Sequence, residues 1–180
     1  MVDLIGFLRP LYQDLDGVSR LDAALRVGAI AQRLAPPSRE LELLILFHPL
    51  GNWLGKVGNL SRVTLNVGDV TESELRRTAA SIKRLDAPAT SAERAVASAF
   101  LLDGAGVRGF AERLSRARRE GSSIAEVCQD ALREEPPPEW LDARAAAWLQ
   151  RRKEARARMA AAVLAETELD DLTSHDRISE

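Results

Sequence analysis

Three strings in which a serine or threonine stands three residues before a glutamate constrain the fold of this chain more than any other feature. They run from Thr71 to Glu74, from Thr90 to Glu93 and from Ser123 to Glu126. In such a string the hydroxyl and the carboxylate each accept a hydrogen bond from a backbone N–H group that the first turn of a helix leaves without a partner. The strings therefore predict three helices, beginning near residues 72, 91 and 124.

The composition also favours helices. Aromatic residues make up only 4% of the 180 residues, and long alternating runs of the β-branched residues that favour strands are missing. Apolar residues recur at helical spacing from Leu21 to Leu34. Pro36 and Pro37 end that pattern, and Ser38 is positioned to cap the next helix. We expect an all-α fold, a single helical bundle of about seven to nine helices.

Glycine, proline and charge mark the boundaries of the later elements. Four glycines make residues 51–70 a loop or a broken helix, and Gly121 is expected to end a helix. Three consecutive prolines, 136–138, lead into a long last helix over about 139–166. Residues 170–180 are polar and acidic, and we expect a flexible tail there. The folded domain then spans residues 1–169.

Charge and cysteine content narrow the functional classes. Lysine and arginine number 25 against 27 aspartates and glutamates, a net charge of −2, so nucleic acid and acidic membranes are not expected partners. The single cysteine, Cys128, excludes an intrachain disulfide and fits a cytoplasmic location. No apolar run approaches the ~18 residues of a membrane span. Inside its helix Cys128 is expected to be a buried, inert thiol.

Three strings in the chain form an ordered set. The first is Leu-Asp-Ala-Ala-Leu-Arg-Val at 21–27, the second is Leu-Ile-Leu-Phe-His-Pro-Leu-Gly at 44–51, and the third ends in Phe-Leu-Leu-Asp-Gly-Ala-Gly at 100–106. In this order they resemble the HD-domain metal-dependent phosphohydrolases, in particular the small stand-alone bacterial type. The resemblance covers about residues 18–168. It implies an HD-like helical bundle whose centre once held divalent cations.

The same resemblance implies that the metal ligands are lost. Ala23 stands where the family has its first histidine, Pro49 replaces the aspartate of the His-Asp pair, and Phe100 replaces a later aspartate. Only His48 remains, and one imidazole does not retain a hard cation such as Mg²⁺. We expect Phe100 to fill the volume that the ion vacated. The implied remnant pocket consists of Ala23, His48, Pro49, Asn52, Phe100 and Asp103.

These substitutions lead to three functional hypotheses. The first is a catalytically inactive HD-like protein without a cofactor, which binds a protein partner or a small phosphorylated ligand. The second is a metal-dependent phosphohydrolase with a shifted metal site, built from Asp22, His48 and Asp103. The third is a helical assembly module unrelated to HD enzymes. The alternative for His48 is a purely structural role, because a lone histidine at the end of an apolar run typically donates a hydrogen bond to a backbone carbonyl.

Two further groups of residues are candidates for binding. Lys56 and Arg62, in the glycine-rich stretch, are candidates for holding an anion. Trp140, Trp148 and Arg152 belong to the expected last helix, and these residue types dominate the energetics of protein interfaces. We therefore expect a homodimer or another protein partner at that helix.

Overall fold

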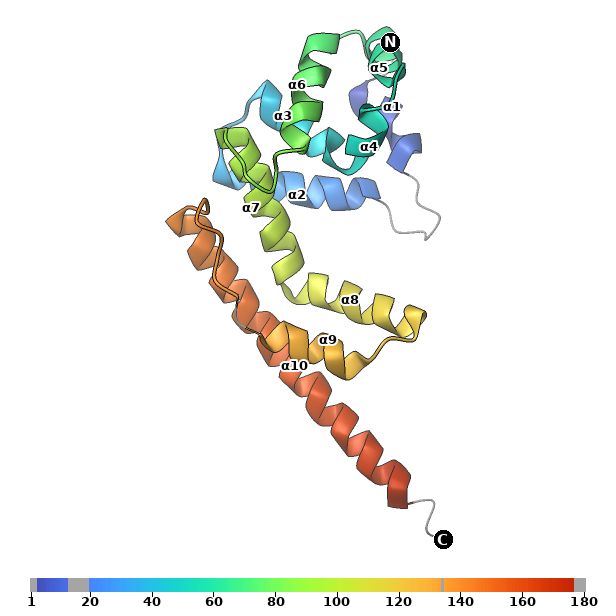
Figure 1. Cartoon of the computed structure of the whole chain (residues 1–180), viewed down its shortest axis with the longest axis vertical. Coiled ribbons are helices and arrows are strands. Elements are labelled where there is room, and N and C mark those ends of the chain that lie inside the picture. The colour runs from blue at the N-terminus through green and yellow to red at the C-terminus, as the bar shows by residue number, and fades with distance from the viewer. Residues whose placement is uncertain (1–2, 13–19, 134, 177–180) are drawn as a thin grey trace. The chain divides into compact units, whose positions relative to one another are not determined.

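The computed structural model describes residues 3–12, 20–133 and 135–176; for Arg20 and residues 168–176 it describes the backbone alone. Every regular element in this part of the chain is a helix (Figure 1). Eight of the described helices have nine or more residues, and α1 and α4 are shorter. The all-α prediction with seven to nine helices is thereby confirmed. The chain divides into two compact units, Met1–Phe100 and Leu101–Glu180, which are described separately.

The first unit is built around α3. This helix packs against both α2 and α6, and six of its nine residues are buried. The chain breaks repeatedly between residues 48 and 70, as the glycines predict, because short helices replace one long helix there. The elements of this unit are α1 (Leu4–Leu8), η1 (Arg9–Tyr12), α2 (Arg20–Leu34), α3 (Arg39–Phe47), η2 (His48–Leu50), α4 (Gly51–Leu54), α5 (Asn59–Val67), α6 (Glu72–Ile82) and α7 (Ser91–Ala105), the last of which continues into the second unit.

The helix starts expected from the hydroxyl-to-glutamate strings are confirmed. Thr71 and Glu74 form a complete reciprocal pair at the start of α6. At the start of α7, the Thr90 hydroxyl accepts from the Glu93 N–H at 3.1 Å, and the Glu93 carboxylate accepts from the Thr90 N–H, also at 3.1 Å. At the start of α9, Ser123 provides the hydroxyl half of the pattern. Ser38 caps α3 as expected, accepting from the Leu41 N–H at 3.1 Å.

The second unit contains the end of α7 together with α8 (Val107–Glu120), α9 (Ile124–Leu132) and α10 (Ala143–Asp176). Helix α9 packs along α10, and α8 contacts both of them (Figure 1). Gly121 ends α8 with φ +68°, a left-handed conformation that favours glycine, so its expected role is confirmed. Cys128 is buried, and burial raises the pKa of its thiol. Phe110, Cys128, Ala131 and Ala160 form a buried cluster in this unit.

The last helix differs from its expected bounds. It begins at Ala143 rather than near residue 139, because Asp142 caps it by accepting from the Ala145 N–H at 2.8 Å. It continues to Asp176, beyond the expected end at 166. Once a helix is nucleated, each further residue adds one hydrogen bond for the dihedral angles it fixes, so a polar segment can extend it. Of the expected tail 170–180, residues 177–180 lie outside the described part of the chain.

Candidate functional site

The side chains of His48 and Phe100 meet, as the sequence predicts. Their ring centroids are 4.3 Å apart and the two planes are nearly perpendicular, at 87°. Phe100 nevertheless remains 40% exposed, so the expectation that it fills an enclosed former metal cavity is wrong. On α7 the neighbouring residues Ala99 and Leu102 turn inward, which leaves Phe100 at the surface with its ring against the imidazole.

The imidazole of His48 is held in a neutral form. Its Nδ1 lies 2.8 Å from the Ile45 carbonyl oxygen, and because a carbonyl only accepts, Nδ1 carries the proton. Burial lowers the pKa of His48 to about 4, although the backbone carbonyls of Ile45 and Leu44 partly oppose this shift. His48 is therefore uncharged at neutral pH, and the expected hydrogen bond to a backbone carbonyl is confirmed.

None of the other residues of the expected pocket is fully buried. Ala23 and Pro49 are half-buried, and Asn52 is exposed on α4. Asp103 belongs to the second unit. Within the residues that the structure describes, no group of three or more His, Cys, Asp or Glu side chains is placed to hold a metal ion.

The two expected anion-binding residues, Lys56 and Arg62, are exposed. Lys56 lies between α4 and α5, and Arg62 lies on α5. Neither residue lines the cavity that the first unit does contain. That cavity, which sequence reasoning missed, lies between α3, α6 and the segment that leads from α6 into α7.

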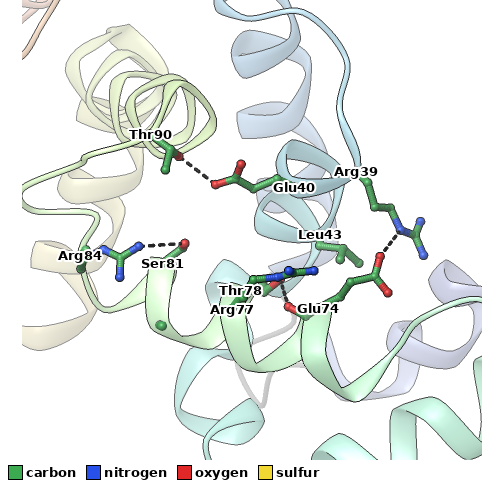
Figure 2. A pocket seen from close by; sticks show the side chains of 10 residues that line it. Arg39, Glu40, Leu43, Glu74, Arg77, Thr78, Ser81, Arg84 and Thr90 are labelled. Atoms are coloured by element: carbon green, nitrogen blue, oxygen red, sulfur yellow. Dashed lines mark hydrogen bonds and ion pairs between the residues drawn. The ribbon is translucent and has the colours of Figure 1, made fainter.

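Figure 2 shows this cavity, which has a volume of about 450 Å³. Pockets that bind small organic molecules typically measure roughly 300–1,000 Å³. Three arginines and two glutamates stand on its walls together with three hydroxyl groups and apolar carbon. The lining residues are Arg39, Glu40, Leu43, Glu74, Arg77, Thr78, Ala80, Ser81, Arg84 and Thr90.

At one end of the cavity, carboxylates surround Arg39. Its Nη1 donates to Glu42 at 2.7 Å, and its Nε lies 3.6 Å from a carboxylate oxygen of Glu74. Its Nη2 donates to the Asp69 carbonyl at 2.9 Å. Hydrogen bonds from the side chain and backbone of Thr71 lower the pKa of Glu74, and the charge of Arg39 adds to this effect. This arginine is therefore largely neutralised by the protein itself.

At the other end, Arg84 donates to Glu93 at 2.6 Å. The Glu93 side chain is completely buried. Burial by itself would raise the pKa of Glu93, but hydrogen bonds from Ser81, from the backbone of Ala89 and Thr90 and from Arg84 outweigh it and lower the pKa to about 2. Glu93 is ionised, and Arg84 is its counter-charge.

The third arginine, Arg77, differs from the other two. It lies on α6, exposed, between the two ends of the cavity wall (Figure 2). Among the described residues it has no ion-pair partner within 4.0 Å, and its charge acts on Glu74 only at longer range. Arg77 is thus the cation of this cavity best able to accept an anionic group from outside.

The hydroxyl groups of the cavity are already engaged. Thr78 donates to the Glu74 carbonyl at 2.9 Å, and Thr90 donates to the Glu40 carboxylate at 2.8 Å. Ser81 bonds with Glu93. These hydrogen bonds hold the polar groups of the cavity wall in place before a ligand binds, and such preorganisation favours binding.

Of the three interface residues expected on the last helix, only two lie on it. Trp140 lies in the turn before α10, because that helix starts at Ala143. Trp148 and Arg152 do share α10, and the Arg152 guanidinium lies 5.3 Å from the centre of the Trp148 ring. Arg152 also donates to the Leu102 carbonyl at 2.6 Å. Both tryptophans are half-buried. The hydrogen bond from Arg152 to Leu102 joins α10 to the end of α7, and the protein partner stays a prediction.

Comparison of the chain with family models, with curated proteins and with solved structures gives no match. The HD resemblance therefore still depends on the three strings alone. Within its described part, the chain has no helix of the length and apolar character that would cross a membrane.

Proposed function

We propose that this protein binds a small organic anion, such as a phosphorylated metabolite, in the cavity between α3 and α6, and that it does so without catalysis. The observation that supports this most strongly is Arg77, an exposed cation without an ion-pair partner among the described residues, on the wall of a 450 Å³ cavity. A guanidinium offers a planar fork of N–H donors that matches phosphate and carboxylate oxygens.

The remaining walls suit the uncharged part of such a ligand. Leu43 and Ala80 provide apolar surface, and Glu40 provides an acceptor for ligand hydroxyl or amino groups. Arg39 and Arg84 add positive potential, although their carboxylate partners weaken it. The ligand class that fits is a compact molecule with one anionic group and several hydrogen-bonding groups.

The absence of catalysis is proposed from the HD resemblance and from His48. In that resemblance Ala23, Pro49 and Phe100 occupy ligand positions and carry no metal-binding group. The remaining His48 donates its Nδ1 proton to a backbone carbonyl, and its Nε2 atom alone does not retain a hard cation. We therefore propose a ligand-binding, non-catalytic relative of the HD hydrolases.

Calorimetric titration of the full chain with glucose 6-phosphate and adenosine 5′-monophosphate, and with glucose and adenosine as uncharged counterparts, tests the proposal. We expect a phosphorylated compound to bind, with roughly tenfold weaker affinity after Arg77→Ala, since hydrogen bonds to charged groups contribute about 1.5–3 kcal/mol. Arg76→Ala is the matched control, because Arg76 is exposed, pairs with Glu72 and does not line the cavity.

Three results would contradict the proposal. The first is the absence of binding by both phosphorylated compounds, and the second is equal weakening of binding by the two arginine variants. The third is release of inorganic phosphate from either compound by wild-type protein supplied with Mn²⁺, lost in His48→Ala, which would establish hydrolysis.

A further inference from the structure

A second pair of arginines, in the other unit, carries an inference independent of the proposed function. Arg113 lies on α8 and Arg156 lies on α10, two helices that pack against each other. Both side chains are half-buried. The Nε and Nη2 atoms of Arg113 and the Nε atom of Arg156 are buried, and none of them has a hydrogen-bond partner in the described structure.

This arrangement is unfavourable for the protein alone. Guanidinium groups stay charged at neutral pH, and a buried N–H donor without an acceptor loses its bonds to water without replacing them. Burial lowers the pKa of Arg156, the neighbouring charge of Arg113 lowers it further, and the charge of Glu135 opposes them in part. Arg113 and Arg156 therefore lie within electrostatic range of each other, and the charge of Glu135 offsets the effect on Arg156 only in part.

The partnerless donors of Arg113 and Arg156 match the oxygen atoms of an anion such as phosphate. Phosphate accepts paired N–H bonds from arginine and neutralises two adjacent positive charges. We propose that Arg113 and Arg156 together bind the phosphate group of a small organic phosphate ester.

The organic part is inferred from the space beside Arg156. This residue lines a cavity of about 430 Å³ between the end of α9, the proline segment and α10. Leu132, Pro136 and Ala157 give that cavity apolar walls. On its rim Lys153 donates to the Glu135 carbonyl at 2.6 Å, which ties the proline segment to α10. A phosphate held by Arg156 would place the rest of an ester at this cavity.

Thermal unfolding of the full chain at matched ionic strength, with added inorganic phosphate, adenosine 5′-monophosphate, adenosine or chloride, tests the site. We expect the monophosphate to raise the Tm of the wild type at lower concentration than inorganic phosphate does, and adenosine to have no effect. Arg113→Gln and Arg156→Gln should each weaken the response to the monophosphate by roughly tenfold. Without phosphate, neither variant should lower the Tm, because each removes one of two repelling charges.

Three control variants complete the test. Arg116→Gln on α8 and Arg158→Gln on α10 change the net charge equally at exposed positions and should keep the full response. Arg77→Ala should keep it too, which separates this site from the cavity of the first unit. A response to inorganic phosphate without a response to adenosine 5′-monophosphate would overturn the proposal that the ligand is an ester and would assign the site to free phosphate. No response of the wild type, or an equal response of wild type, Arg113→Gln and Arg156→Gln, would overturn the site itself.

Discussion

The guanidinium of Arg84 donates to the buried carboxylate of Glu93 at 2.6 Å, across nine residues of chain. The same carboxylate accepts from the backbone N–H groups of Ala89 and Thr90, at 2.7 and 3.1 Å. One side chain therefore caps α7 and also fixes the connection from α6. Because Ser81, Arg84 and Thr90 line the cavity of the first unit, Glu93 sets the shape of a wall that it does not itself line.

Replacing Glu93 with glutamine should destabilise the protein by roughly 3 kcal/mol, because the amide leaves Arg84 without its counter-charge and turns a donor toward backbone donors. Urea unfolding measures this loss. Glu126→Gln is the matched control: Glu126 holds the same third position of α9, is exposed, and should cost less than about 1 kcal/mol. Equal losses in the two variants would show that the buried ion pair contributes nothing beyond helix capping.

The stability should depend on pH through His48. Its pKa is about 4 in the folded protein and 6.5 in an exposed chain, so the unfolded state binds the proton more tightly. The stabilisation is complete above pH 6.5 and declines as the pH falls toward 4, by about 2 kcal/mol between pH 7.5 and 5. His48→Gln should abolish this decline, whereas His175→Gln should retain it. An unchanged pH profile of His48→Gln would contradict the burial of a neutral imidazole.

Acid should destabilise the protein through Glu93 in a separate range. Its pKa is lowered to about 2 from an ordinary value of 4.5. This contribution is present above pH 4.5 and is lost as the pH falls toward 2, by up to about 3 kcal/mol. Below pH 4.5 the unfolding free energy should therefore fall less steeply in Glu93→Gln than in His48→Gln. An equally steep fall in the two variants would contradict this assignment.

In the second unit, Arg152→Lys should destabilise the protein by about 1–2 kcal/mol. Lysine cannot both donate to the Leu102 carbonyl as Arg152 does and keep a planar group over Trp148. Thermal unfolding checks this, with Arg151→Lys as the control because Arg151 is exposed on the same helix. A Tm that does not distinguish the two variants would exclude an energetic role for the contact.

Two glycines near the turn from α7 to α8 should respond in opposite directions to alanine. A Cβ at Gly104 meets open space, so Gly104→Ala should stabilise the protein by roughly 0.5–1 kcal/mol. A Cβ at Gly109 would overlap the backbone carbonyl of Gly104, so Gly109→Ala should destabilise it. A shared sign in the two changes of Tm would show that this close approach of the backbone does not exist.

Local signals predicted the fold well. The hydroxyl-to-glutamate strings located the starts of α6, α7 and α9, because a cap is formed by residues four positions apart or fewer. Helix α10 starts later than the proline segment predicts, because the carboxylate of Asp142 caps it. It continues to Asp176 because extending an existing helix costs little even without an apolar face.

The candidate site was largely hidden from sequence reasoning. The contact between His48 and Phe100 was expected from the HD resemblance, but the exposure of Phe100 depends on how α7 is rotated. The cavity combines Arg39 with residues of α6 almost 40 positions later, and only the packing of α3 against α6 brings them together. Such long-range placement leaves no periodic pattern in the chain.

The most direct test of the binding account is a two-dimensional ¹⁵N–¹H NMR titration of the full chain with glucose 6-phosphate and with adenosine 5′-monophosphate. If the cavity between α3 and α6 is the ligand site, the amide signals of Arg77, Thr78, Ser81 and Thr90 should shift together and saturate, and in Arg77→Ala the shifts of the other three should need roughly tenfold more ligand. An absence of shifts at these four amides with both compounds, or an unchanged titration midpoint in Arg77→Ala, would contradict it.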